Sequence, residues 1–200
     1  MLDGLQRERP RRLGVVGLGI GTLASYARPG DRLRFYELDP NVIDLARRDF
    51  TFLRDSAAQI TLLTGDGRLL LAREAPQAFD VLVLDAFSSD AVPVHLLTRQ
   101  AFEIYVRQLA ADGVLLANVS NRHLAVERVV RASALGAGLA CEVVETQTNT
   151  PGQVGHVSWA VMAKDPALVA RLLGDLPRKA THEPDVLWSD SRASVLSILR

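Results

Sequence analysis

The sequence predicts an α/β protein, a three-layer sandwich with a seven-stranded, mostly parallel sheet between two layers of helices. Short apolar runs alternate with segments of helical spacing, which is the rhythm of parallel β-α-β units. A glycine-rich turn follows the first apolar run, as expected where a strand leads into a helix beside a ligand. The last two apolar runs are joined by only five residues.

The apolar runs place the strands, and residues with helical spacing place the helices between them. Pro40 suits the first turn of a helix, because its fixed φ and missing N–H are tolerated there. Strands are expected near 13–17, 33–37, 59–64, 79–85, 113–119, 141–147 and 156–163. Helices are expected over 21–28, 40–50, 67–74, 96–111 and 124–138.

The last two strands are predicted to pair as an antiparallel hairpin, because residues 149–153 are too few for a crossover helix. A dinucleotide-binding Rossmann domain usually stays parallel. The fold of transferases that use S-adenosylmethionine (AdoMet) instead ends with an antiparallel seventh strand. We therefore expect a Rossmann-like AdoMet-transferase sheet with an antiparallel last strand.

Composition favours one compact domain, since 200 residues with 48% hydrophobic content can bury a substantial core. We expect an N-terminal extension over 1–12, a catalytic domain over 13–176 and a tail over 177–200 that packs on it. Lys plus Arg equals Asp plus Glu at 23 each, so no strong field favours nucleic acid. No apolar run reaches the roughly 18 residues of a membrane span, which predicts no membrane contact by this chain. Cys141 is the only cysteine, which excludes an internal disulfide and suits a cytoplasmic location.

The turn Gly17-Leu18-Gly19-Ile20-Gly21 carries the first functional signal, together with Glu37 at the end of the second strand. Glycines are needed where a side chain would block a bound nucleoside or where φ is positive. An acid about 20 residues further on can accept both hydroxyls of a ribose. We assign Gly17, Gly19, Gly21, Glu37 and the adjacent Leu38 to a cofactor site.

Two further acids follow strands. Asp66 stands with Gly67 in the turn after the third strand, where it can accept the exocyclic amine of an adenine or cap the next helix. Asp85 ends the fourth strand, and Asp90 follows in the same loop. Such carboxylates can hold and deprotonate an amine, with Asp85 as the base or orienting group and Asp90 as the binder, unless Asp90 only caps a helix. Asn118 after the fifth strand either faces the acceptor or ends the strand.

These motifs together resemble the spermidine synthase (polyamine aminopropyltransferase) family over roughly residues 13–163. The quoted segments are 17–21, Glu37-Leu38-Asp39-Pro40-Asn41-Val42-Ile43, Gly65-Asp66-Gly67-Arg68 and Asp85-Ala86-Phe87-Ser88-Ser89-Asp90. The loop 85–98 and Trp188-Ser189-Asp190 are most similar to the branch fused to membrane segments.

The resemblance implies the class I AdoMet-dependent transferase fold and an enzyme that passes an aminopropyl group from decarboxylated AdoMet to a diamine such as putrescine. It places Glu37 at the ribose, Asp66 at the adenine, and Asp85 at the position of the catalytic acid. A homodimer and a small-molecule amine substrate are implied as partners. The family's small N-terminal β-domain, which supplies part of the amine site, has no counterpart among the residues before the first strand.

Two other functions stay open. Family members carry an Asp inside the glycine-rich turn that contacts the aminopropyl ammonium, and Ile20 stands at that position. Without that Asp, the carboxylate of AdoMet itself is no longer repelled, which favours an AdoMet-dependent methyltransferase. The third interpretation is a non-catalytic cofactor-binding domain. The histidines have no metal-ligand spacing, so no metal site is expected.

Overall fold

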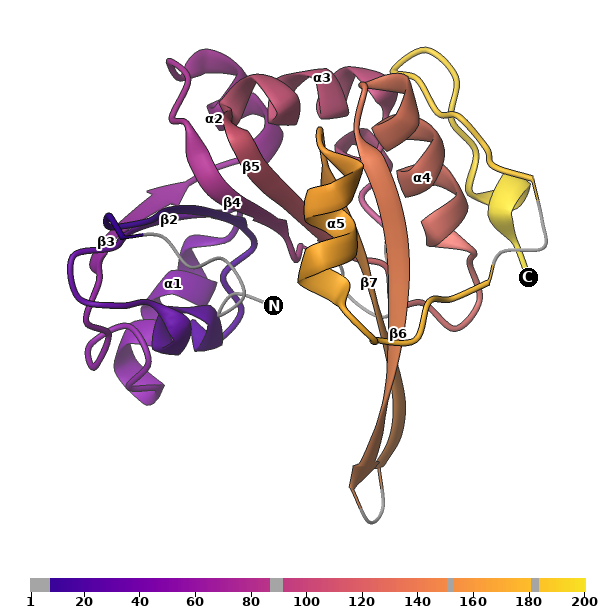
Figure 1. Ribbon diagram of the computed structural model, residues 1–200. Helices are drawn as coiled ribbons and strands as arrows, with labels where there is room; N and C mark the ends of the chain where they lie inside the picture. Colours follow the sequence, from indigo (N-terminus) through magenta and orange to yellow (C-terminus); the bar gives the residue numbers. More distant parts are fainter. Residues whose placement is uncertain (1–7, 87–91, 151–152, 181–183) are drawn as a thin grey trace.

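The computed structural model describes residues 8–86, 92–150, 153–180 and 184–200, with backbone only for 147–150 and 153–156. Figure 1 shows a central sheet flanked by helices. The strands are β1 (Arg12–Val16), β2 (Arg32–Glu37), β3 (Gln59–Thr64), β4 (Phe79–Leu84), β5 (Leu109–Asn118), β6 (Ala140–Thr150) and β7 (Gln153–Ala163). The α-helices are α1 (Pro40–Asp49), α2 (Gly67–Arg73), α3 (Arg99–Gln108), α4 (Val126–Gly136) and α5 (Pro166–Leu173). Short 3-10 helices are η2 (Thr22–Tyr26), η3 (Val94–Leu96) and η4 (Val195–Ile198).

The sheet has the order β3-β2-β1-β4-β5-β7-β6. The pairs among β1 to β5 are parallel, whereas β7 is antiparallel to both β5 and β6. The predicted α/β class and the antiparallel last strand are confirmed. The chain reverses direction across the sheet between β1 and β4, and ligands of such sheets bind outside the carboxyl ends of the strands at this point.

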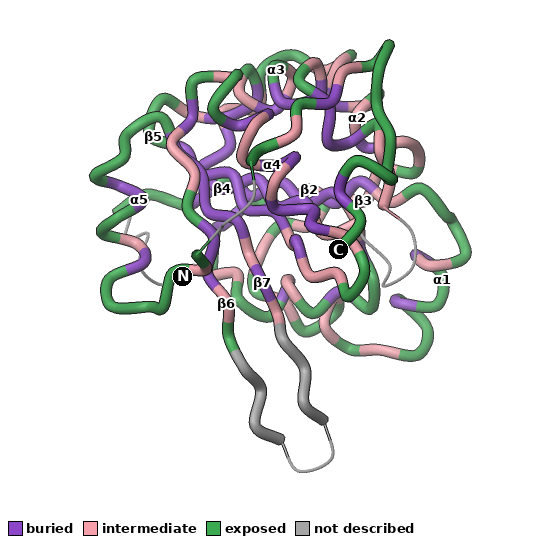
Figure 2. Tube along the Cα trace, turned by 90° about the vertical axis from the view of Figure 1, so that its right-hand side faces the viewer, coloured by how far each residue is buried: buried purple, intermediate pink, exposed green. Residues whose placement is uncertain are grey.

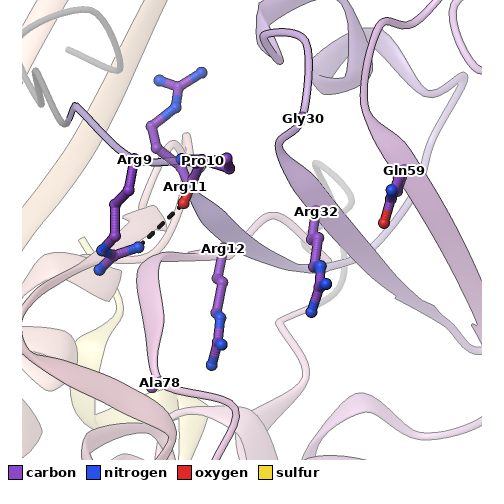
Figure 3. A pocket seen from close by; sticks show the side chains of 8 residues that line it. All are labelled: Arg9, Pro10, Arg11, Arg12, Gly30, Arg32, Gln59 and Ala78. Carbon is purple, nitrogen blue, oxygen red and sulfur yellow. Dashed lines mark hydrogen bonds between the residues drawn. The ribbon is translucent and has the colours of Figure 1, made fainter.

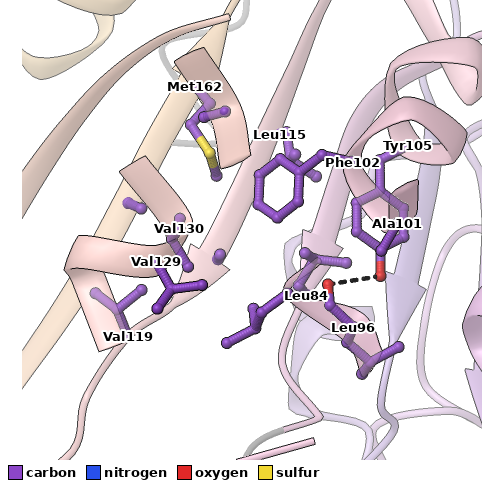
Figure 4. Close-up of a cluster of buried hydrophobic side chains, with 14 of the residues drawn as sticks. Leu84, Leu96, Ala101, Phe102, Tyr105, Leu115, Val119, Val129, Val130 and Met162 are labelled. Atoms are coloured by element: carbon purple, nitrogen blue, oxygen red, sulfur yellow. Dashed lines mark hydrogen bonds between the residues drawn. The ribbon is translucent and has the colours of Figure 1, made fainter. Parts of the chain in front are cut away.

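Two apolar cores lie on the two faces of the sheet. One face packs against α2, α3 and α4. In this core Leu84, Leu115 and Met162 of the strands lie in one cluster with Phe102 of α3 (Figure 4). The other face packs against η2, α1 and α5. Figure 2 shows the buried residues gathered along the strands between these layers, as expected for a three-layer sandwich.

Two helices are shorter than their sequence pattern predicts. The segment 21–28 forms only η2, because Gly21 begins it in a left-handed conformation without a side-chain cap. The segment 96–111 is divided between η3 and α3. The side chain of Thr98 caps α3 by accepting the Ala101 N–H, and the helix ends at Gln108, where β5 begins. Residues 109–111 have helical spacing in the sequence, but they belong to β5 in the structure.

Helix α5 is absent from the predicted elements, although its boundaries carry sequence signals. Asp165 accepts the N–H of Ala167 as the N-cap, and Pro166 occupies the first turn. Gly174 follows the last turn with a φ of 48°. The hairpin strands are also longer than predicted, and they extend past the rest of the sheet (Figure 1). No helix in the described residues is long and apolar enough to cross a membrane.

The C-terminal segment contacts the helix layer beside α3 and α4. Trp188 is buried, and its carbonyl accepts the backbone N–H of Arg99. Further on, the carbonyl of Ile198 accepts the N–H of Ala125 at the start of α4. These contacts hold residues 184–200 against the domain.

The amino ends of the strands are held by a buried ion pair between Arg11 and Asp31, each at most 2% exposed. The Arg11 guanidinium donates to Asp31 at 2.7 Å, and the backbone N–H groups of Arg11 and Arg28 donate to the same carboxylate. Burial alone would raise the pKa of Asp31, but these hydrogen bonds outweigh it and hold the pKa below its usual value.

We expect Asp31→Asn to lower the free energy of unfolding by about 3 kcal/mol at pH 7, because it removes the carboxylate charge that the buried Arg11 guanidinium contacts. Chemical denaturation measures the change. Asp49→Asn is the control, because Asp49 forms only an exposed pair with Arg48 on α1, and its free energy of unfolding should match that of the wild type.

The difference in the free energy of unfolding between wild type and Asp31→Asn should also depend on pH. Because the folded state lowers the pKa of Asp31, the stabilisation is complete above the unfolded pKa of about 3.9 and is lost as pH falls through the folded-state pKa. Wild type and Asp31→Asn should therefore begin to converge in stability below about pH 4, and the convergence is complete only below the folded-state pKa of Asp31. A constant difference from pH 7 to pH 3 would show that the carboxylate charge is not its source.

Candidate functional site

A cleft of about 370 Å³ opens at the carboxyl ends of the first four strands. Its walls come from the turns after β1 and β2, the start of α2 and the segment after β4. The predicted residues that line it are Gly17, Gly19, Glu37, Leu38, Asp66, Gly67 and Asp85. Because parallel strands end at one edge of the sheet, side chains far apart in the sequence meet here. We call this space the carboxyl-end cleft.

The turn after β1 packs closely against the backbone of the residues that follow β4. A Cβ atom at Gly17 would lie 2.5 Å from the carbonyl oxygen of Asp85, and the φ of Gly17 is +96°. The N–H of Asp85 donates to Val16 at 2.8 Å, which fixes the two segments together. Glycine is therefore required at position 17. Gly21 has a positive φ as well, but it caps η2 and is not part of the cleft wall.

Glu37 links the two turns that form one wall of the cleft. Its Oε2 accepts the backbone N–H of Leu18 at 2.9 Å, and its Oε1 accepts the N–H of Asp39 at 3.0 Å. Each carboxylate oxygen has a second lone pair, so both oxygens can still accept a ligand hydroxyl. The carboxylate is half-buried and held by backbone groups, which orients it before any ligand binds.

The same wall has an apolar part. Leu38 is 69% exposed and lines the cleft together with Val42. Ile20 in the glycine-rich turn is an apolar residue that is 39% exposed, but it is not among the residues that line the cleft. Apolar surface of this kind suits the flat face and thioether of a nucleoside ligand better than it suits water.

Asp66 caps a helix and also lines the cleft. Its Oδ1 caps α2 by accepting the N–H of Leu69 at 2.9 Å. Its Oδ2 faces the cleft and lies 2.9 Å from Nε2 of His95, which precedes α3. The sequence gives no spacing signal that pairs these residues, and it favours a solvent-facing or helix-capping His95 over one that lines the acceptor pocket. Here His95 lines the cleft.

A side-chain network connects this corner of the cleft to the C-terminal segment. The Arg68 guanidinium donates to both carboxylate oxygens of Asp190, at 2.8 and 2.6 Å, and to the carbonyl of His95. Thr98 also donates to Asp190. The hydrogen bond from Arg68 lowers the pKa of Asp190 below its usual value. The tail therefore supports the residues that carry Asp66 and His95.

Asp85 lies where β4 ends, beside the glycine-rich turn. Its Oδ1 accepts the side-chain N–H of Asn118 at 2.9 Å, and Oδ1 of Asn118 accepts the N–H of Ser120, which fixes the amide. Burial raises the pKa of Asp85 above its usual value, and the hydrogen bond from Asn118 opposes this shift. Asn118 is thus a partner of Asp85 at the end of β5.

Several other residues that could bear on the site lie outside the described residues or away from the cleft. Asp90 and Phe87 lie outside the described residues. Tyr105 is fully buried and donates to the carbonyl of Leu96, so it does not fill the space beside Asp85. Burial raises the pKa of Cys141 to about 12, which is unsuitable for a thiolate nucleophile. In the described part of the chain, no group of acids, histidines and cysteines is arranged to hold a metal.

Two sequence relatives bear on what the cleft binds. The chain is 33% identical over 115 residues to a polyamine aminopropyltransferase of Vibrio vulnificus, an alignment that covers 55% of this chain and 38% of that protein. It is 31% identical over 135 residues to the eEF1A lysine and N-terminal methyltransferase of Mus musculus, covering 62% of this chain and 19% of that protein. The chain thus spans less than two fifths of the length of either relative. No protein-family model matches it.

Solved structures give the same pair of likenesses. The spermidine synthase of Thermotoga maritima aligns with a TM-score of 0.62 at 15% identity, covering 95% of this chain and 66% of that one. Human methyltransferase-like protein 13, solved in complex with SAH, aligns with a TM-score of 0.62 at 20% identity, covering 90% and 92% of the two chains. These structures confirm the class I AdoMet-transferase fold.

The aminopropyltransferase relatives confirm the resemblance to the spermidine synthase family that the motifs predict. The closer likeness to the membrane-fused branch stays a prediction, as do the roles of the individual residues.

We expect Asn118→Ala to raise the pKa of Asp85 further, because the variant removes the hydrogen bond that favours the carboxylate while burial continues to disfavour it. An NMR titration of the labelled Asp85 carboxyl carbon measures this pKa. Asn41→Ala is the control, since Asn41 contacts Asp39 on the exposed start of α1. An equal pKa in wild type and Asn118→Ala would remove Asn118 as the partner that orients Asp85.

Proposed function

We propose that the chain is the catalytic domain of a spermidine synthase-like aminopropyltransferase. It would move an aminopropyl group from decarboxylated AdoMet to a small diamine such as putrescine. The observation that carries this proposal is the position of Asp85. Its partly buried carboxylate stands at the cleft, beside the glycine-rich turn and across from Glu37 and Asp66. The relatives named as aminopropyltransferases support the same assignment.

The side chains of the cleft have the chemical properties that the groups of the co-substrate would need. Glu37 would accept the ribose hydroxyls, and Leu38 would cover one face of the nucleoside. Asp66 would accept the adenine amine, with His95 holding its second oxygen. Gly17 and Gly67 would keep the cleft walls close together, since a Cβ at Gly67 would lie 2.7 Å from a side-chain carbon of Val16. A Cβ at Gly19 would meet no atom within 4 Å, so Gly19 would leave open space for the ligand beside the turn. Decarboxylated AdoMet would act as a substrate, and no metal is needed for this chemistry.

The reaction would be a direct displacement. The neutral amine of the acceptor attacks the carbon beside the sulfonium, so an N–C bond forms as the C–S bond breaks, and the electron pair stays on sulfur. Methylthioadenosine leaves. Asp85 would take one proton from the cationic acceptor before the attack, so that the neutral amine is the nucleophile, and the positive charge of the sulfonium would then pass to the new secondary ammonium. A carboxylate in a low-dielectric site also attracts the cationic acceptor. Asp90 would bind the far end of the diamine, and the homodimer and the cytoplasmic location stay predictions.

An AdoMet-dependent methyltransferase is the second candidate, and Ile20 favours it. An exposed apolar side chain stands where an acid would meet the aminopropyl ammonium, so nothing there repels the carboxylate of AdoMet. The methyltransferase relative and the SAH-bound structure support this alternative. If neither co-substrate binds, the third candidate, a non-catalytic cofactor-binding domain, is favoured.

We expect decarboxylated AdoMet and methylthioadenosine to bind the purified chain more tightly than AdoMet does. Calorimetric titration of the three compounds in parallel compares their Kd values without any acceptor. Glu37→Gln should weaken all three by at least about tenfold, because it replaces a charged hydrogen-bond acceptor. Glu103→Gln on the exposed side of α3 is the matched control. Tighter binding of AdoMet would instead favour methyl transfer.

We expect Asp85→Asn to lower kcat for aminopropyl transfer by about 100-fold or more, while the Kd of methylthioadenosine stays unchanged. Steady-state kinetics with putrescine measure the loss. Because burial raises the pKa of Asp85, the acidic limb of the kcat/KM profile should lie above the pH range of an ordinary aspartate. The rate should rise with pH as Asp85 loses its proton.

Asp175→Asn, an exposed change after α5, is the control for this variant and should keep the wild-type rate. Full activity of Asp85→Asn would remove Asp85 from the mechanism.

A further inference from the structure

A second hollow lies at the opposite end of the sheet, where β1, β2 and β3 begin. It has a volume of about 490 Å³ and adjoins another of about 200 Å³. The two spaces share Arg12, Arg32 and Gln59 in their walls. We call them together the arginine hollow. It has no residue in common with the carboxyl-end cleft.

The register of the strands places its polar side chains in two rows. Arg12 pairs directly with Arg32 across β1 and β2, and Arg32 pairs with Gln59 across β2 and β3. Figure 3 shows these three side chains pointing to the same side of the sheet. Arg34 and Thr61 follow two residues later on their strands, and therefore lie on the same face. Both line the smaller part of the hollow.

The other arginines around this hollow are neutralised by acids. Arg9 pairs with Asp80 at 2.7 Å, Arg11 with Asp31 at 2.7 Å, and Arg34 with Glu74 at 2.6 Å.

Arg12 and Arg32 differ from them. The Arg12 guanidinium donates only to the carbonyl of Gln77, at 3.2 Å, and Arg32 has no ion-pair or hydrogen-bond partner for its side chain among the described residues. Both side chains are exposed, so their heads are open to a ligand. Two positive charges thus remain unbalanced in one hollow.

This arrangement is unfavourable without a ligand. Neighbouring strands lie about 4.8 Å apart, so the two arginines start side by side. Like charges directly opposite each other in a sheet are destabilising. A planar guanidinium offers paired donors that match a phosphate group, and two adjacent ones can hold one phosphate or two linked phosphates. The amide of Gln59 and the hydroxyl of Thr61 add neutral hydrogen-bonding groups beside them.

We propose that the arginine hollow is a binding site for a phosphate group, held between Arg12 and Arg32. The ligand is a phosphorylated small molecule or a phosphate headgroup that enters from solvent. Its binding removes the repulsion between the two arginines and so stabilises the fold. The site is independent of the carboxyl-end cleft and of the reaction proposed there.

Calorimetric titration with pyrophosphate at low ionic strength tests the site, because surface charges are least screened there. The wild type should bind pyrophosphate, and the Tm should rise with ligand concentration. Arg12→Gln and Arg32→Gln should each weaken binding by about tenfold or more, and the double variant should abolish it. A parallel sedimentation assay with vesicles containing phosphatidic acid identifies a headgroup as the source, if vesicles bind and pyrophosphate does not.

The matched control is Arg47→Gln with Arg48→Gln, which removes the same charge from the exposed end of α1. It should keep the wild-type Kd. The double hollow variant should also fold, because it removes a repulsion, and its circular dichroism spectrum and Tm check this. Equal binding by both double variants, or no binding of pyrophosphate or vesicles to the wild type, would overturn the proposal.

Discussion

The contact on which the site depends is the close approach between the turn after β1 and the backbone that leaves β4. Only a hydrogen atom fits on Gly17 beside the carbonyl of Asp85. This contact joins two walls of the carboxyl-end cleft at the point where the sheet reverses its strand order. It also brings Asp85 next to the glycine-rich turn, so that a carboxylate from the fourth strand would face a ligand held by the first two strands. Glu37 then ties that turn to the start of α1 through backbone N–H groups.

The two ends of the parallel strands differ in charge, although the chain has equal numbers of acidic and basic residues. The carboxyl ends carry Glu37, Asp66 and Asp85, and these acids would attract the cationic sulfonium and amine of the proposed reaction. The amino ends carry arginines, most of them paired with buried or half-buried acids. The buried pairs at this end fix the strand starts in place. The opposite charges of the two ends suggest that each end can bind its own ligand without competing with the other.

Much of the fold could be predicted, because periodicity and turn length are local properties of the sequence. The short connection expected at residues 149–153 was enough to predict the antiparallel ending. The meeting of Glu37, Asp66 and Asp85 followed from one rule, that parallel strands end at a common edge. The partners of these acids could not be predicted in the same way. Asn118 is 33 residues from Asp85, and Asp190 is 122 residues from Arg68, and no local pattern links such pairs. Helix α5 could have been predicted from its capping residues, Asp165 and Gly174. The early end of α3 could not, because it results from the pairing of β5 with β4, which helix propensity does not reflect.

The position of β7 between β5 and β6 has a consequence for the order in which the chain can assemble. Strands β1 to β5 complete all of their mutual pairings within the first 118 residues. The edge of β5 then stays unpaired until residue 163 has been synthesised, because its partner is the last strand and not the next one. The hairpin pairs with β5 through its second arm, and every residue that lines the carboxyl-end cleft precedes the hairpin in the chain. During translation, this open edge is the surface of the nascent protein that most needs protection from other chains.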